Sequence, residues 1–202
     1  MAKLLVYYAH PGQQFSRTNL AMAKAAQGID GITFVDLYAE YPRHDIDVPR
    51  EQKRLLDHDV ILFQFPLYWY STPSLIKEWQ DLVLQHGFAY GHEGNQLVGK
   101  TMMLAITAGG PEDAYTPNGY QHYPLRTFLT PLEQTARLCK MRFATPYALY
   151  GALSADTEGE IRAHASGFHQ LLKAMRDDKY DFDKAGEFDV LSYRTLPIKV
   201  EV

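Results

Sequence analysis

The chain has 202 residues, 20 of them basic and 24 acidic, and a formal net charge of -4. This length suits one α/β domain with a full hydrophobic core. Because the charges are well mixed, the composition gives no electrostatic indication of a nucleic-acid or anionic-membrane partner, and the only cysteine, Cys139, excludes an intrachain disulfide. No apolar run is long enough for a signal peptide or a membrane span, so we expect a soluble, cytoplasmic protein.

Apolar runs alternate with amphipathic segments along the chain. Strands are predicted over residues 3–8, 31–37, 59–65, 100–107 and 144–150. Helices are predicted over residues 17–27, 49–57, 73–86, 124–138 and 157–176. This alternation predicts an α/β fold with a doubly wound, five-stranded parallel sheet of the flavodoxin-like order 2-1-3-4-5.

The predicted flavodoxin-like domain covers residues 1–176. Within it, residues 38–47 are charged and are expected to be irregular. Beyond it, residues 177–202 are charged and aromatic without clean periodicity. We expect this end to be a partly disordered tail or an arm on a neighbouring subunit.

The most informative segment runs from Phe63 to Pro73, where an apolar strand enters a loop of aromatics and prolines. In open α/β folds, ligands bind at the carboxyl ends of the strands. Trp69 and Tyr70 in this loop would offer flat faces to a planar ring such as a flavin, a quinone or a base. Taken alone, each aromatic is explained as well by a core cluster.

Two further loops are predicted to meet the first in one crevice, because they follow strands one and four. One contains His10 and residues 15–19, whose hydroxyls and helix N-terminal amides suit a phosphate, although Ser16 alone is better explained as a helix cap. The other is Thr107 to Gly110, whose glycines allow close backbone approach to a ring but also serve in ordinary turns. The convergence of all three loops is what favours a ligand site.

Several motifs carry a family resemblance: Tyr8 to Pro11, Asn19, Phe63 to Tyr70, Pro73, Lys77 to Trp79, Gly87 to Tyr90, Thr107 to Gly110, and Tyr115. With them the chain resembles the NAD(P)H:quinone oxidoreductases of the flavodoxin-like superfamily, the DT-diaphorase group. Two segments, Asp47 to Gln52 and His86 to Lys100, are most similar to the small bacterial flavoproteins that accompany glutathione-gated potassium-efflux systems. Those proteins have quinone-reductase activity and act as ancillary subunits.

The resemblance implies a flavin site, with FMN favoured over FAD because the region that holds adenine in the larger enzymes is not evident. It assigns the ribityl and phosphate end of the flavin to His10, Ser16, Arg17, Thr18 and Asn19. It assigns the isoalloxazine edge to Pro66, Leu67, Tyr68, Trp69 and Tyr70, and the backbone cradle to Thr107, Ala108, Gly109 and Gly110.

The resemblance also implies catalytic and substrate residues. Tyr115 matches a flavin-contacting tyrosine that helps to stabilise charge as hydride moves to the flavin. Its partner histidine aligns with Gln121, and His122 is the next residue, so the Tyr-His relay departs from the family pattern. Tyr90 and His92 fall where the family places two substrate-pocket tyrosines, so one of that pair is replaced.

The function implied by the resemblance is FMN-dependent, two-electron ping-pong reduction of quinones by NAD(P)H. The alternative is a regulatory flavoprotein that binds and activates a potassium-efflux transporter at the inner face of the membrane. A flavodoxin that carries electrons is disfavoured, because such carriers are strongly acidic. A homodimer is expected, because the resemblance implies a substrate pocket completed by a second subunit and because the aromatic loop over residues 88–92 would otherwise expose apolar surface.

The sequence lacks the residues that define several other kinds of catalytic site. The chain contains no P-loop, nucleophile-elbow or zincin motif, and its histidines show no metal-ligand spacing, so no metal site is predicted. His164 and His169, five residues apart on the last predicted helix, are expected to face solvent. A cysteine phosphatase on a similar fold would need Cys139 in the first loop, but it precedes the fifth strand.

Overall fold

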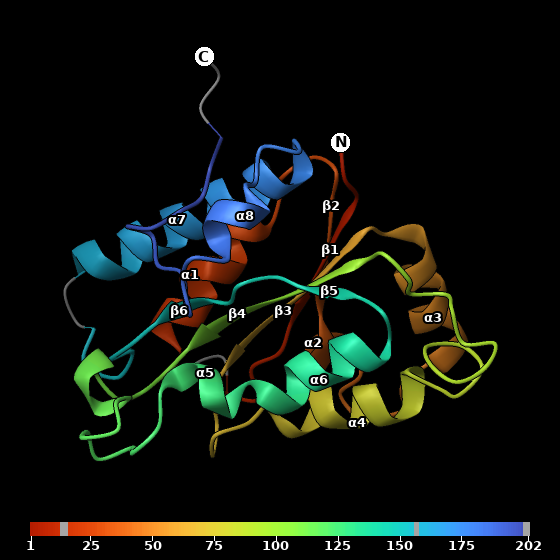
Figure 1. Ribbon diagram of the computed structural model, residues 1–202, viewed down its shortest axis with the longest axis horizontal. Coiled ribbons are helices and arrows are strands. Elements are labelled where there is room, and N and C mark those ends of the chain that lie inside the picture. The colour runs from red at the N-terminus through yellow and green to blue at the C-terminus, as the bar shows by residue number, and fades with distance from the viewer. Residues whose placement is uncertain (13–15, 156–157, 200–202) are drawn as a thin grey trace.

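The computed structural model describes residues 1–12, 16–155 and 158–199. Its strands are β1 (Leu4–Tyr8), β2 (Ile32–Asp36), β3 (Val60–Pro66), β4 (Thr101–Thr107), β5 (Arg142–Phe143) and β6 (Tyr147–Leu149). They form one parallel sheet in the order β2-β1-β3-β4-β5, with β6 also paired to β4 (Figure 1). This order confirms the predicted doubly wound, flavodoxin-like topology.

Helices cover both faces of the sheet (Figure 1). One face carries α3 (Val48–Asp57), α4 (Ser74–Val83), α5 (Leu125–Phe128) and α6 (Thr130–Leu138), and the other carries α1 (Arg17–Ala26) and α7 (Glu158–Arg176). The short helices are α2 (Leu37–Glu40), η2 (Glu112–Ala114) and α8 (Phe182–Ala185). The predicted start of the last helix, residue 157, lies outside the described residues. No helix in the described part of the chain is long and apolar enough to cross a bilayer.

Each face of the sheet has its own hydrophobic core. Successive residues of β1 point to opposite faces, so that Leu5 and Tyr7 join one core while Leu4 and Val6 join the other. The strands β1, β3 and β4 are buried along their whole lengths. Burial on both faces explains why they read as continuous apolar runs rather than as alternating patterns.

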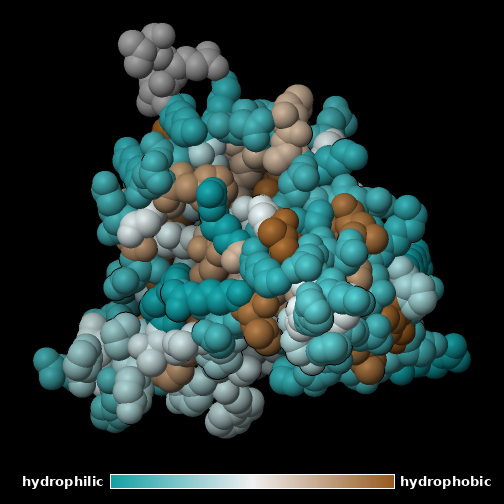
Figure 2. All heavy atoms as spheres, turned by 45° about the vertical axis from the view of Figure 1, so that its right-hand side comes forward, coloured by the Kyte–Doolittle hydropathy of each residue, from teal (hydrophilic) through white to brown (hydrophobic). Residues whose placement is uncertain are grey.

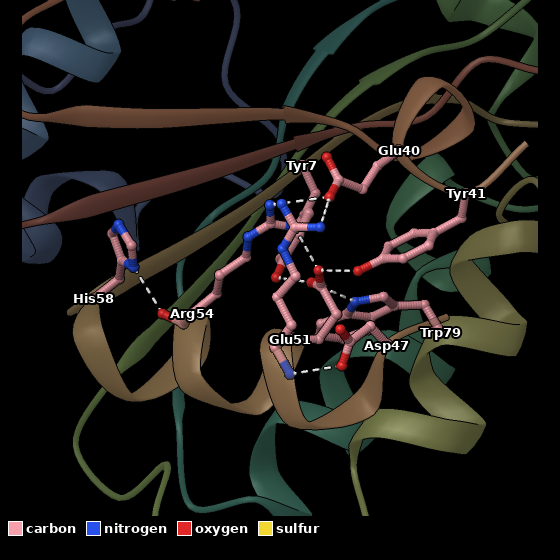
Figure 3. Close-up of polar contacts among 9 residues, drawn as sticks. Tyr7, Glu40, Tyr41, Asp47, Glu51, Arg54, His58 and Trp79 are labelled. Atoms are coloured by element: carbon pink, nitrogen blue, oxygen red, sulfur yellow. Dashed lines mark hydrogen bonds and ion pairs between the residues drawn. The ribbon is translucent and has the colours of Figure 1, made fainter. Parts of the chain in front are cut away.

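A buried carboxylate fastens α3 and α4 to the sheet (Figure 3). Glu51 of α3 is fully buried and accepts hydrogen bonds from the hydroxyls of Tyr7 and Tyr41 and from the guanidinium of Arg54; the Tyr41 bond is 2.6 Å long. The indole Nε1 of Trp79 donates a further bond of 3.0 Å. Burial and the adjacent carboxylate raise the pKa of Tyr7. Because each partner donates, the charge is satisfied inside the core.

Prolines divide two of the predicted elements. The helix predicted over residues 124–138 is two helices, α5 and α6, because Pro131 in the first turn of α6 has no N–H to continue the hydrogen bonds of α5. Of the fifth strand predicted over residues 144–150, only β6 (Tyr147–Leu149) forms, while β5 (Arg142–Phe143) precedes the predicted range and Pro146 lies between the two. In the segment expected to be irregular, Asp36 caps the single turn of α2.

Residues 177–199 pack against their own chain. The side chains of Tyr180, Ala185 and Leu191 are buried, and Leu191 pairs in parallel with Tyr147 of β6. This segment therefore covers the edge of the sheet beside β6. The domain boundary at residue 176 stays a prediction.

His164 of α7 is fully buried, which corrects the expectation that it faces solvent. Its ring stacks on Tyr147, with centroids 4.4 Å apart and planes inclined by 13°. Among the described residues, neither ring nitrogen has a hydrogen-bond partner. Burial therefore lowers the pKa of His164 to about 3. His169 is half-buried rather than solvated, and its Nδ1 lies 2.9 Å from the carbonyl oxygen of Ala25.

We expect His164 to reduce stability in mild acid. An unfolded histidine has a pKa of about 6.5, so below this pH the unfolded chain binds a proton that the folded chain does not. Through this residue alone, the free energy of unfolding should fall by about 2 kcal/mol between about pH 7 and pH 5. Urea denaturation of the wild type and of His164→Phe at both pH values measures how much of the acid-induced fall in the free energy of unfolding comes from His164. An equal acid loss in both proteins would contradict the assignment.

Candidate functional site

Three loops at the carboxyl edge of the sheet enclose a cavity of about 440 Å³. They follow β1, β3 and β4, as expected for a ligand site at the point where the strand order reverses. The predicted cofactor residues that line the cavity are His10, Ser16, Arg17, Thr18, Asn19, Pro66, Leu67, Tyr68, Thr107 and Gly109. Its volume lies within the usual range for small-molecule sites.

The loop after β1 presents the N-terminus of α1 to the cavity. Ser16 caps this helix, because its Oγ accepts a hydrogen bond of 3.2 Å from the backbone N–H of Asn19. The capping role and the position at the cavity therefore coexist in one residue. The N–H groups of a helix's first turn and its dipole favour an anion such as a phosphate.

His10 is held as a neutral ring beside this helix end. Its Nδ1 accepts a hydrogen bond of 3.2 Å from the backbone N–H of Gly12, and its Nε2 lies 3.5 Å from the hydroxyl of Tyr68. Burial lowers the pKa of His10, so the imidazole is neutral near pH 7. Because Nδ1 is an acceptor, the ring proton is on Nε2, on the side of Tyr68.

Two buried polar side chains, Asn19 and Thr107, line the cavity, and a third, Gln64, is buried behind them. Asn19 Nδ2 donates to the hydroxyl of Thr107, and Gln64 Nε2 donates to the carbonyl oxygen of Asn19, both at 2.9 Å. Within the described residues, Asn19 Oδ1 and Gln64 Oε1 are buried and have no hydrogen-bond partner. Unpaired buried acceptors are costly, so these atoms mark a place for hydroxyl donors. The sequence-based site omitted Gln64, although a polar residue within an apolar strand was a usable signal.

Trp69 and Tyr70 form the tip of a two-residue hairpin turn. Tyr68 and Ser71 exchange two backbone hydrogen bonds of 3.0 Å across it, and φ is +48° at Trp69 and +64° at Tyr70. These left-handed values favour glycine or asparagine and strain bulky side chains. The Trp69 side chain is 93% exposed, so a core cluster does not explain it. Strained aromatics of this kind concentrate at functional sites.

The loop after β4 has little room for side chains. A Cβ added at Gly110 would lie 3.2 Å from the ring of Tyr115, and one at Gly109 would lie 3.1 Å from Leu153. Ala108, between β4 and these glycines, is buried. Gly109 is exposed and Gly110 half-buried, so the backbone of this loop is open to close approach by a ligand, while neighbouring side chains leave no room for a Cβ at either position.

Tyr115 lies behind Gly110 and is not among the residues that line the cavity; its side chain is 8% exposed. Burial raises the pKa of Tyr115, while a hydrogen bond from the backbone of Gly110 opposes that effect. Gln121 reaches the same glycine, with its Nε2 3.6 Å from a Cβ built at Gly110. The structure thus brings Tyr115 and Gln121 together. His122 is exposed, at a φ of +60°.

Tyr90 and His92 lie in the segment between α4 and β4, which enters β4 at its amino end, whereas the cavity lies at the carboxyl ends of the strands; Figure 1 shows this segment beside α3. One chain alone does not bring them to the cavity. Phe88 and Tyr90 are partly buried against their own core, so exposed aromatic surface on this loop, one of the two reasons for expecting a homodimer, is smaller than expected. Figure 2, which brings this side forward, shows apolar residues only in small groups among hydrophilic ones.

A family model described as a flavodoxin-like fold matches residues 2–172, and the chain belongs to this family. Among curated proteins, a glutathione-regulated potassium-efflux system ancillary protein, KefG of Cronobacter sakazakii, is 47% identical over 171 residues, which cover 85% of this chain and 92% of that protein. The KefG of Escherichia coli strain K12 is 45% identical over 171 residues, covering 85% and 92% of the two chains.

Solved structures share the fold but carry different names. General stress protein 14 of Treponema denticola, in complex with FMN, has a TM-score of 0.81 at 34% identity and covers 86% of this chain and 99% of its own. An NADPH-quinone reductase of P. pentosaceus has a TM-score of 0.71 at 27% identity, covering 83% and 96%. A tryptophan halogenase of Streptomycin violaceusniger has a TM-score of 0.79 at 42% identity, covering 82% and 96%. The activity must therefore be argued from the site.

The strained turn predicts that Trp69→Gly stabilises the ligand-free protein. Glycine adopts positive φ without the steric cost borne by tryptophan, and the exposed indole contributes no burial that the change would lose. We expect the free energy of unfolding to rise by about 0.5–1 kcal/mol, measured by urea denaturation. Tyr120→Gly, at another exposed aromatic that lacks a positive φ, is the matched control. Destabilisation of both variants alike would show that the turn is unstrained.

Proposed function

We propose that this chain is an FMN-dependent NAD(P)H:quinone oxidoreductase that reduces quinones by two electrons in a ping-pong cycle. The observation that carries the proposal is the cavity at the carboxyl ends of β1, β3 and β4. It combines a helix N-terminus, unpaired buried acceptors and accessible glycine backbone. These three features suit the phosphate, the hydroxylated chain and the planar ring of FMN. The family's FMN-bound structure supports a flavin here.

The residues of the cavity divide along the length of FMN. The first turn of α1, with Ser16, Arg17 and Thr18, would hold the phosphate, and Asn19 Oδ1 would accept hydrogen bonds from ribityl hydroxyls. The 66–70 turn and the 107–110 backbone would enclose the ring. FMN, when bound, accepts a hydride from NAD(P)H and delivers it to a quinone, which becomes a hydroquinone on taking up a proton. We favour FMN over FAD, since no adenine-holding region is evident.

The chain's own contribution is placement and charge stabilisation. The turn of Trp69 and Tyr70 would exclude water from the edge of the ring and orient the substrates on its face. Because its pKa is raised, Tyr115 stays protonated near neutral pH and can donate a hydrogen bond to negative charge that develops on the ring. Gln121 can orient Tyr115, but its amide cannot exchange a proton as the family's histidine does. His122 is the nearest alternative in sequence for that exchange.

A homodimer is part of the proposal. Tyr90 and His92 lie away from the cavity of their own chain, so a role in the quinone pocket requires them to come from a second copy. Exposed aromatics around the carboxyl edge offer apolar surface for such a contact: Trp69 is 93% exposed, Tyr120 65% and Tyr123 56%. A second copy that covered these rings would remove their apolar surface from water.

The second candidate function is that of an ancillary flavoprotein that binds and activates a potassium-efflux transporter from the inner face of the membrane. The names of the KefG relatives, 45–47% identical to this chain, favour it. In that case flavin binding would persist while quinone turnover was residual. Turnover that survives substitution of the outer surface would favour the enzyme instead.

The first expectation from the proposal is noncovalent FMN. The purified protein, as isolated or after incubation with FMN and gel filtration, should show flavin absorbance and oxidise NAD(P)H with a quinone. Trp69→Ala should weaken FMN binding by on the order of 1 kcal/mol, since a stacked aromatic is lost. Trp79→Phe, at a core position on α4, is the control and should retain FMN. Failure to retain flavin after reconstitution would refute the proposal, whereas bound FMN without turnover would select the ancillary function.

The second expectation concerns the hydroxyl of Tyr115. Tyr115→Phe should slow reduction of the bound flavin by NAD(P)H about tenfold or more while leaving FMN affinity nearly unchanged, because only the hydrogen bond to developing charge is lost. Gln121→Ala should have a smaller effect. Stopped-flow absorbance follows this half-reaction separately from quinone reduction. A Tyr115→Phe protein reduced at the wild-type rate would leave Tyr115 as a pocket wall only.

A further inference from the structure

One phenylalanine joins the segments that surround the proposed flavin. The ring of Phe128 lies 4.9 Å from that of Tyr70, 6.2 Å from that of Tyr115 and 6.1 Å from that of Tyr123, measured between centroids. The Tyr70 pair is tilted by 31°, and the other two pairs meet edge to face at 81° and 82°. These separations are those of favourable aromatic pairs. Phe128 thereby contacts the turn after β3, the loop after β4 and the segment that precedes α5.

Phe128, whose side chain is half-buried, is the member of this cluster that an α-helix carries. It is the last residue of α5, a single turn beside the carboxyl ends of β3 and β4 (Figure 1). Its neighbours Leu125 and Leu129, 1% and 0% exposed, are buried in the core on the α3, α4 and α6 side of the sheet. The helix stops here because Pro131, in the first turn of α6, has no N–H to continue its hydrogen bonds, and this break sets the position of the Phe128 ring. The three tyrosines, in contrast, are carried by loops and turns.

We propose that Phe128 is a positioning residue for the reaction: it holds Tyr115 against Gly110 and Tyr70 at the edge of the ring, so that the two tyrosines keep one relative geometry. The inference rests on the proposed function, in which the Tyr115 hydroxyl meets developing charge. Tyr115 has one further ring contact, with Tyr150 at 5.5 Å. Tyr150 follows β6, so that contact does not fix Tyr115 relative to the turn after β3.

The geometry predicts that Phe128→Leu slows the reaction through Tyr115. Leucine fills most of the space but lacks the ring face and edge, so the expected fall in the rate of flavin reduction is about tenfold in the FMN-loaded protein. The matched control is Phe143→Leu, a half-buried ring of β5 that packs on the same core and carries the guanidinium of Arg126 at 4.8 Å. The control should keep the wild-type rate.

A double-mutant cycle separates positioning from general loosening of the core. If Phe128 acts through Tyr115, adding Tyr115→Phe to Phe128→Leu should slow flavin reduction by less than about twofold further, although it costs about tenfold in the wild type. If the double variant reduced flavin more slowly by the product of the two single-variant effects, the inference would be overturned. Equal slowing by Phe128→Leu and Phe143→Leu would overturn it as well.

A readout without flavin distinguishes this inference from the proposed function. In protein labelled with 3-fluorotyrosine, the ¹⁹F resonances of Tyr70 and Tyr115, assigned from their phenylalanine variants, should shift in Phe128→Leu and stay in place in Phe143→Leu. Unshifted resonances in Phe128→Leu would overturn the positioning role even in an active enzyme. Shifted resonances in a protein that retains no FMN would refute the proposed function while leaving the contact itself supported.

Discussion

The constraint on which the site depends is the position of β1 inside the sheet. β1 pairs with β2 on one side and with β3 on the other. The connection after β1 therefore runs to one side of this strand, and the connection after β2 brings the chain back to its other side, at β3. No connection crosses the carboxyl end of β1, which leaves a crevice between the loops that follow β1 and β3. The cavity lined by the β1, β3 and β4 loops occupies that crevice. Its location is thus a consequence of topology before any particular side chain is considered.

Buried polar groups hold the two helical layers in different ways. On the α3 and α4 side, Glu51 of α3 accepts hydrogen bonds from Tyr7 of β1 and Trp79 of α4, and so joins both helices to the sheet. On the α1 side, the contacts among Gln64, Asn19 and Thr107 leave acceptors unpaired. The first network is complete without a ligand. The second is incomplete, and the proposed FMN would supply the missing donors.

Strain and exposure at the cavity's rim point to function in the same way. The left-handed turn at Trp69 and Tyr70 lowers stability, yet one of its rings faces solvent and the other packs on Phe128. Tyr115, Tyr120 and Gln121 surround Gly110, where an added Cβ would lie only 2.8 Å from the hydroxyl of Tyr120. These residues at the rim of the cavity contribute little to the stability of the fold. The strain in their backbone is understandable if they position the proposed flavin ring and a substrate.

The sequence by itself determined the strand order and the three loops of the site, because buried parallel strands leave unbroken apolar runs and their ends carry unmistakable turn residues. The family resemblance in the sequence also implied roles for individual residues of the site. Where a sequence pattern allowed two interpretations, only the tertiary structure decided between them. His164 is buried because α7 turns that face onto Tyr147, and one helix became two because the bonds that Pro131 cannot make end α5 at Phe128. Gln64, Phe128 and the remote placement of Tyr90 depend on contacts between residues far apart in the chain, which no local pattern encodes.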